Sequence, residues 1–248
     1  MKIYIGLTLF LLFSQGILKA QQKEQLKTYD HLHHEGQTLK VYAENGWIEL
    51  TAYQPNVVKV SYLKNHKQLL DSSYVVVAKP YPTFVRVAQN LDNIFFETDS
   101  LFITINKWNF NIHFEGVKHK LLTNNNLAYT ISDSLKVLDF SLAPQEAIYG
   151  LGSRALPVNR RGYLLENYHQ PHYGYVYGER NLNISVPFYT SNRGYGIYFD
   201  NKGDGFFDIG KSQPNQFQFS TQNGNLSYYF ISGDYKSVLE AYTWLTGK

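Results

Sequence analysis

The chain has 248 residues, among them 21 Tyr, 16 Phe and 3 Trp, and a formal net charge of +3. A hydrophobic fraction of 44% with only 17% charged residues supports a packed core and excludes a disordered chain. The near balance of charge, without a long basic run, argues against nucleic acid or an anionic membrane surface as the main partner. The length suits one β-sandwich or one barrel, and not both.

Residues 1–20 are typical of a secretory signal peptide. Lys2 precedes an apolar run from Ile3 to Phe13, and a more polar stretch ends at the small residue Ala20. A membrane anchor would need about 18 to 20 unbroken apolar residues, which this segment lacks. We therefore expect cleavage after Ala20, a secreted or periplasmic location, and no membrane association afterwards. The chain has no cysteine, which excludes a lipoprotein anchor, disulfides and thiolate ligands.

Residues 21–38 are polar and contain three clustered histidines, His31, His33 and His34. Imidazoles at this spacing can converge on one metal ion. Only Asp30 and Glu35 accompany them as possible further ligands, so we favour an exposed lead-in segment and expect no metal site.

From Leu39 onward, apolar residues alternate with polar ones, which is typical of half-buried strands. The apolar positions of 101–105 and 110–114 predict one hairpin, closed by the loop around 106–109. The runs at 217–219 and 226–231 flank Asn223-Gly224, a strong turn signal, and predict a second hairpin. Many short strands with frequent Gly and Asn turns favour an all-β sandwich over residues 39–233.

One segment, 234–248, predicts a helix. Asp234 is a suitable N-cap and Gly247 a suitable stop. Apolar residues recur between them at helical spacing, namely Tyr235, Val238, Leu239, Tyr242 and Leu245. We interpret this helix as a connector toward a following domain, outside the single domain that precedes it.

Motifs for catalysis are weak in this chain. Ser153 lacks the flanking pattern of a nucleophile elbow, and the loop from Asp200 lacks the acidic twelfth ligand of a calcium site. Paired carboxylates would serve sugar hydrolysis, but Glu146, Glu166 and Glu179 are each more typical of surface or loop positions. We therefore assign no catalytic residue and expect no cofactor.

Tyrosines crowd one glycine-containing stretch of the chain. They are Tyr163, Tyr168, Tyr173, Tyr175 and Tyr177, and they stand close to Asn167, His169 and His172. Aromatic faces with amide and imidazole groups can bind pyranose rings. Tyrosines also suit strands and loop packing, and composition alone favours that interpretation.

Several motifs in the second half resemble the N-terminal region of glycoside hydrolase family 31. These are PQEAIYGLG (144–152), RRG (160–162), NY (167–168), VPFYTS (186–191) and GYGIYFDN (194–201). The ending resembles it too, with YYFISG (228–233) followed by LTG (245–247). Residues 39–143 fit only generally, as earlier strands of the same sandwich.

The resemblance implies a galactose-mutarotase-like β-sandwich that precedes a catalytic (β/α)8 barrel in retaining α-glycosidases. The family's catalytic aspartates lie on barrel loops downstream of this region, so the chain as it stands is expected to be noncatalytic. A family loop after the Arg-Gly motif helps to shape the sugar pocket, which implies Asn167, Tyr168 and His169 as substrate-loop candidates. His169 stands where the family often has Asp, and Ser153 stands where an acidic residue often follows the Gly-x-Gly.

Three hypotheses follow. The leading one is a noncatalytic sandwich that packs against a barrel and completes its pocket for an α-linked sugar. It predicts exposed apolar side chains near the terminal helix or the loop from Arg160 to Tyr177. The second is a free-standing sugar-binding module that uses the tyrosine-rich stretch. The third is a mutarotase-like enzyme, which requires a histidine base and a carboxylate across a cleft.

Overall fold

The computed structural model describes residues 23–64, 73–131, 135–169, 173–222 and 226–247. The expected signal peptide, the Asn223-Gly224 turn and His172 lie outside these ranges. Of the helices in the described part, none is long and apolar enough to cross a bilayer.

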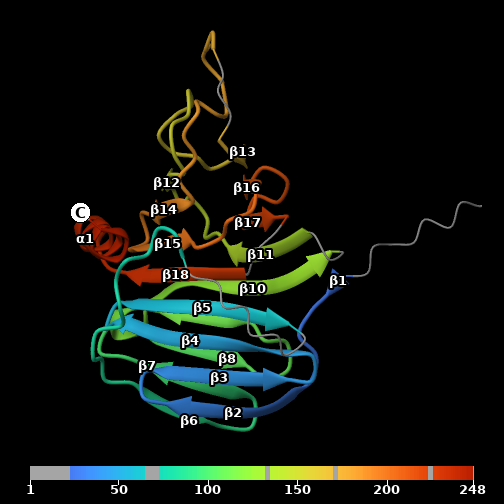
Figure 1. Cartoon of the computed structure of the whole chain (residues 1–248), viewed down its shortest axis with the longest axis vertical. Helices are drawn as coiled ribbons and strands as arrows, with labels where there is room; N and C mark the ends of the chain where they lie inside the picture. Colours follow the sequence, from blue (N-terminus) through green and yellow to red (C-terminus); the bar gives the residue numbers. More distant parts are fainter. Residues whose placement is uncertain (1–22, 65–72, 132–134, 170–172, 223–225, 248) are drawn as a thin grey trace, which may run out of the picture.

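The fold is an all-β sandwich of two antiparallel sheets, as expected from the sequence (Figure 1). The ten-stranded sheet runs in the order β13 (Leu164–Asn167), β16 (Gly205–Ile209), β17 (Gln216–Thr221), β11 (Leu135–Ser141), β10 (Leu121–Ile131), β9 (Ile112–Glu115), β8 (Phe102–Asn106), β7 (Asn93–Glu97) and β6 (Arg86–Gln89), with β1 (Lys23–Glu24) paired to β10. The eight-stranded sheet runs in the order β12 (Ile148–Gly150), β14 (Phe188–Ser191), β15 (Tyr195–Phe199), β18 (Leu226–Ser232), β5 (Val57–Lys64), β4 (Gly46–Gln54), β3 (Thr38–Ala43) and β2 (Tyr29–Glu35). A short 3-10 helix, η1 (Val117–His119), precedes β10.

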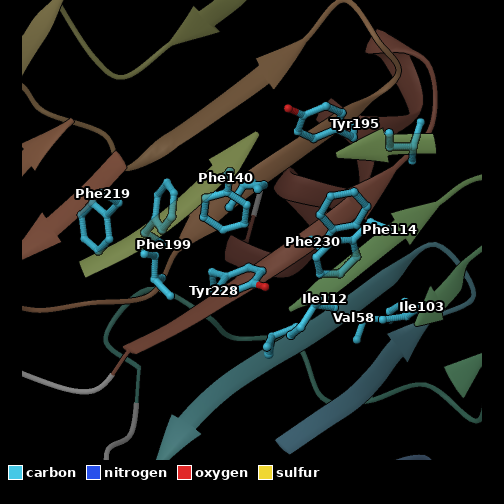
Figure 2. Close-up of a cluster of buried hydrophobic side chains, with 14 of the residues drawn as sticks. Val58, Ile103, Ile112, Phe114, Phe140, Tyr195, Phe199, Phe219, Tyr228 and Phe230 are labelled. Atoms are coloured by element: carbon cyan, nitrogen blue, oxygen red, sulfur yellow. The ribbon is translucent and has the colours of Figure 1, made fainter. Parts of the chain in front are cut away.

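Aromatic rings from both sheets meet in the core, which Figure 2 shows in close-up. Phe114 of β9 stacks on Phe230 of β18, with ring centroids 4.1 Å apart. Phe199 of β15 stacks on Phe219 of β17 at 4.3 Å. These four rings are essentially buried, and burial of each contributes about 1.5–3 kcal/mol to folding. Much of the aromatic excess therefore belongs to the core.

The sandwich begins before residue 39. Strand β2 falls in the segment expected to be a lead-in, and it pairs with β3 in the register His33↔Lys40. Leu32 and Tyr29 pack partly against the core, which gives this polar segment enough apolar contact to join the sheet. His31 contacts Asp30 at 2.9 Å and stacks on a tyrosine ring.

Of the two predicted hairpins, one is confirmed and one is wrong. Strands β8 and β9 pair as expected, with Ile103 opposite Phe114. Strands β17 and β18 do not pair with each other: β17 lies between β11 and β16, and β18 lies between β5 and β15 in the other sheet. The Asn-Gly signal predicts a reversal of the chain, but it does not determine the sheet that each flanking strand joins.

The predicted helix is present as α1 (Tyr235–Thr246) and packs on the outer face of β14, β15 and β18 (Figure 1). The Asp234 side chain caps its first turn by accepting a hydrogen bond from the Ser237 amide at 2.8 Å. The ring of Tyr242 stacks on Phe188 at 3.8 Å between centroids. All seven residues of β18 are buried, in contrast to the period-two pattern of a half-exposed strand, and α1 covers part of the outer face of this strand.

Candidate functional site

The chain between β13 and β14 extends beyond the ends of the two sheets (Figure 1). We refer to its described residues, 168–169 and 173–184, as the projecting loop. Strand β13 leads into it and is fixed by pairing with β16, where Asn167 lies opposite Gly205. The loop returns toward β14 through Ser185, whose hydroxyl donates to Asn167 Oδ1 at 2.9 Å. Asn167 is therefore a buried residue that joins the two ends of the loop.

The Gly150-Leu151-Gly152 turn packs closely against the returning end of the loop. Gly152 has a φ of +86°, and a Cβ at this position would lie 2.2 Å from the Ile184 carbonyl oxygen. Both observations require glycine. The Ser153 amide donates to that same carbonyl at 2.8 Å, and the Gly178 amide donates to the Ala155 carbonyl at 2.9 Å. Backbone hydrogen bonds thus fix the returning half of the loop.

Arg154 is a buried side chain that connects four segments around the loop base. Its guanidinium donates to the backbone carbonyls of Leu151, Glu166 and Arg180 at 3.0, 2.8 and 2.5 Å, and to the Ser185 hydroxyl at 2.9 Å. Burial lowers the pKa of Arg154 to about 10, with a smaller contribution from the nearby Arg160 charge. Arg154 therefore remains charged at neutral pH and holds both ends of the loop.

The two remaining substrate-loop candidates have local partners. The Tyr168 hydroxyl donates to Glu166 Oε2 at 2.9 Å, and this hydrogen bond, followed by burial, raises the pKa of Tyr168. His169 Nδ1 lies 3.1 Å from the Asn183 carbonyl oxygen, so the ring donates a hydrogen bond there. His169 is exposed, and its contact is with the returning end of the loop.

A cavity of about 460 Å³ lies at the base of the projecting loop. Its described lining residues come from the end of β13 and from the loop, and they are Glu166, Tyr168, Val176, Tyr177, Gly178, Glu179, Arg180 and Asn181. Of the three substrate-loop candidates, Tyr168 lines the cavity, whereas Asn167 and His169 do not. Two of the scattered carboxylates, Glu166 and Glu179, are brought to this one cavity.

Large apolar side chains of and near the loop are exposed. The exposed fraction reaches 89% for Tyr173 and 84% for Tyr177. Val158, Val176 and Ile184 are also exposed, while Tyr163 packs partly against the core. The sequence predicted exposed apolar residues near this loop or near the terminal helix, and Tyr235 of α1 is exposed as well.

The sequence reasoning missed two buried charged residues. Glu146, expected at a surface or loop position, lies in the connection between β11 and β12, but it is 2% exposed and accepts hydrogen bonds from buried hydroxyl groups. No role was predicted for Arg154, because its partners are mostly backbone carbonyls, which every residue type has. Within the described ranges, no group of three His, Asp or Glu side chains could hold a metal ion.

The family model of the glycosyl hydrolase 31 N-terminal galactose mutarotase-like domain matches residues 48–208 of the chain. The chain belongs to this family. The matched range includes the Gly150-Leu151-Gly152 turn, Arg154 and the projecting loop, so the site described above is part of the family domain.

Curated relatives of this family domain include two glycosidases. Alpha-xylosidase XylQ of Lactiplantibacillus pentosus is 37% identical over 108 residues, which is 43% of this chain and 14% of the relative. Alpha-glucosidase 2 of Bacillus thermoamyloliquefaciens is 23% identical over 238 residues, which is 90% of this chain and 29% of the relative. The chain thus spans less than a third of the length of these relatives.

Solved structures of family 31 enzymes have the same fold. The Flavobacterium johnsoniae dextranase complexed with isomaltotriose matches with a TM-score of 0.86 and 25% identity over 91% of this chain and 29% of the enzyme. An alpha-xylosidase from a soil metagenome, complexed with xylose, matches with a TM-score of 0.73 and 18% identity over 88% of this chain and 35% of the enzyme. The second match is evidence for the fold alone.

Proposed function

We propose that the chain acts as the noncatalytic N-terminal domain of an exported retaining α-glycosidase. In this proposal it packs against a catalytic (β/α)8 barrel, and the projecting loop overhangs the barrel mouth and forms part of the pocket for an α-linked sugar. The export signal predicted in residues 1–20 supports the location.

The position and surface of the projecting loop carry the proposal. The loop extends beyond the sheets and exposes Tyr173, Tyr177 and Val176, although its base is fixed by Arg154 and by backbone hydrogen bonds. A rigid loop with an exposed aromatic and apolar surface is suited to contact with a second domain or with a sugar ring. Because the chain belongs to the N-terminal domain family of glycosyl hydrolase 31, the second domain that the loop would contact is the catalytic barrel of such an enzyme.

A chimeric enzyme tests this proposal. The chain replaces the matched N-terminal segment of the Flavobacterium johnsoniae dextranase, and hydrolysis of isomaltotriose is measured. We expect Tyr173→Ala to lower kcat/KM about tenfold, because an exposed aromatic that contacts barrel or sugar typically contributes on the order of 1 kcal/mol or more. The matched control is Tyr81→Ala, another exposed tyrosine that lies outside the loop, and kcat/KM should change less than about twofold.

Equal effects of the two substitutions would contradict the proposal. If the chimera does not fold, the same pair of variants of this chain is mixed with the separate catalytic barrel of the dextranase, and hydrolysis of isomaltotriose is compared. The same difference between Tyr173→Ala and Tyr81→Ala is expected there, and its absence would count equally against the loop.

A further inference from the structure

Trp108 is an exposed aromatic side chain in the turn between β8 and β9, and a hydrogen bond holds its ring. It is 74% exposed, whereas Trp47 is 7% exposed and Trp244 is half-buried. Tryptophan is highly buried on average, so this exposure is unusual. The indole Nε1 donates to Asp92 Oδ1 at 2.9 Å, in the neighbouring turn between β6 and β7. The ring is therefore fixed at its edge while most of its surface is open to solvent.

The turn that carries Trp108 also has an uncommon backbone conformation. Phe110, two residues later, is 6% exposed and has a φ of +57°, which bulky residues rarely adopt. The Asn106 side chain accepts hydrogen bonds from the amides of Trp108 and Asn109 at 3.0 and 3.2 Å. The turn thus buries one of its two aromatic rings in the core and exposes the other.

Lys107 joins the two turns to each other and to the second sheet. Its amide donates to the Asp92 carbonyl at 2.8 Å, and its Nζ donates to the Asn90 carbonyl at 2.6 Å. The same Nζ lies 4.9 Å from the centre of the Tyr29 ring in β2. A surface that is already ordered loses less conformational entropy when a ligand binds.

The groups beside Trp108 narrow the chemistry of such a ligand. Leu91 adds an apolar side chain that is 84% exposed. The Nδ2 groups of Asn90 and Asn109 donate to no residue that the structure describes, so they are available to a ligand. Asp92 and Lys107 are the charged residues of these turns, and their opposite charges disfavour a strongly charged ligand. An aromatic face beside amide donors suits a neutral sugar ring.

The size and place of this surface favour a narrow ligand. A stable protein interface buries about 800 Å² on each partner, far more than two apolar side chains between polar turns provide. A polysaccharide chain needs only a few stacked rings. The turns belong to strands at the edge of the ten-stranded sheet opposite β13, and in Figure 1 β6, β7 and β8 lie toward the bottom while the projecting loop is at the top.

We propose that residues 90–92 and 107–109 form a surface platform for a neutral polysaccharide, with a sugar ring of the chain stacked on the Trp108 indole. The platform lies outside the projecting loop and goes beyond the proposed function. It rests on that function only for the choice of an α-linked glucan as the probe.

Affinity electrophoresis of the purified chain in native gels that contain dextran tests the platform. We expect the polymer to retard the chain, and Trp108→Ala to weaken this binding about fivefold or more, because one aromatic contact is lost. Trp108→Phe keeps an aromatic face and should weaken it less. The matched control is Phe84→Ala, which removes a 71% exposed ring at the opposite end of β6 and should leave the retardation unchanged. In the unsubstituted chain, dextran should also protect tryptophan fluorescence from quenching by acrylamide.

Absence of retardation, or equal retardation of Trp108→Ala and the unsubstituted chain, would overturn the inference. Self-association in sedimentation velocity that Trp108→Ala abolishes, without dextran binding, would show a protein contact and would also overturn it. The two proposals fail separately. If Tyr173→Ala impairs the chimera but the free chain does not bind dextran, the pocket loop stands and the platform falls. If dextran binding depends on Trp108 but Tyr173→Ala and Tyr81→Ala are equal in the chimera, only the platform stands.

Discussion

Glu146 is a buried carboxylate that fixes the chain after β11. Its oxygens accept hydrogen bonds from the Ser191 hydroxyl at 2.5 Å, the Tyr195 hydroxyl at 2.6 Å and the Ala143 amide at 2.8 Å. These partners join the turn at 143–147 to strands β14 and β15. The sequence did not predict this role, because Ser191 and Tyr195 are distant in the chain and meet Glu146 only in the folded sheet.

Glu146→Ala should lower the free energy of unfolding by about 3 kcal/mol, because it leaves two buried hydroxyls and one amide without their acceptor. Glu146→Gln retains an acceptor oxygen and should cost less. Urea unfolding of both variants checks this order, with the exposed Glu240→Ala on α1 as the control that should change stability by less than about 0.5 kcal/mol. Equal stability of Glu146→Ala and the control would show that these contacts contribute nothing.

At the scale of elements, the projecting loop depends on side-chain contacts at its base. Arg154 connects the turn after β12, the end of β13 and the returning end of the loop. Arg154→Met keeps much of the apolar length but removes every donor. We expect amide hydrogen exchange in residues 173–184 to become about tenfold faster or more, since each lost hydrogen bond contributes on the order of 1 kcal/mol to local stability.

The control for this loop prediction is Arg86→Met, which removes an exposed arginine that pairs with Glu97 at the edge of the ten-stranded sheet opposite β13. It should leave exchange in the projecting loop unchanged. Unchanged loop exchange in Arg154→Met, or acceleration spread evenly over the core strands, would contradict the role assigned to Arg154.

Local signals predicted some elements better than others. The helix was predicted closely because Asp234, Gly247 and the apolar spacing are all contained within one short segment. The β8–β9 hairpin was predicted for the same reason. The pairing of β17 and β18 was not, because each strand joins a different sheet through distant partners. In the site, Tyr168 lines the cavity, and its role as a substrate-loop residue stays a prediction. Arg154 and the cavity depend on contacts that form only in the folded chain.

At the scale of the whole molecule, buried tyrosines link stability to alkaline pH. Burial raises the pKa above the ordinary value of 10.0 for Tyr62, Tyr189, Tyr195, Tyr228 and Tyr229. The unfolded chain therefore releases phenolic protons near pH 10, while the folded chain retains them. The stability that these groups contribute is fully present below about pH 10 and is lost as pH rises toward the folded pKa values.

Above pH 10, each such tyrosine should lower the free energy of unfolding by about 1.4 kcal/mol per pH unit. Guanidinium unfolding at a series of pH values measures this slope, and Tyr228→Phe should reduce it by about the contribution of one group. An unchanged stability above pH 10 would mean that the tyrosines ionise in the folded state and that the core admits their charge.

The proposed function depends on contact between the projecting loop and a catalytic barrel. Hydrogen exchange of the chain, alone and mixed with the catalytic barrel of the Flavobacterium johnsoniae dextranase, tests it most directly. We predict slower exchange in residues 173–184 and around Val158 when the barrel is present, with the edge strands β2 and β6 unchanged. Protection confined to those edge strands, or no protection of the loop at any barrel concentration, would contradict the account.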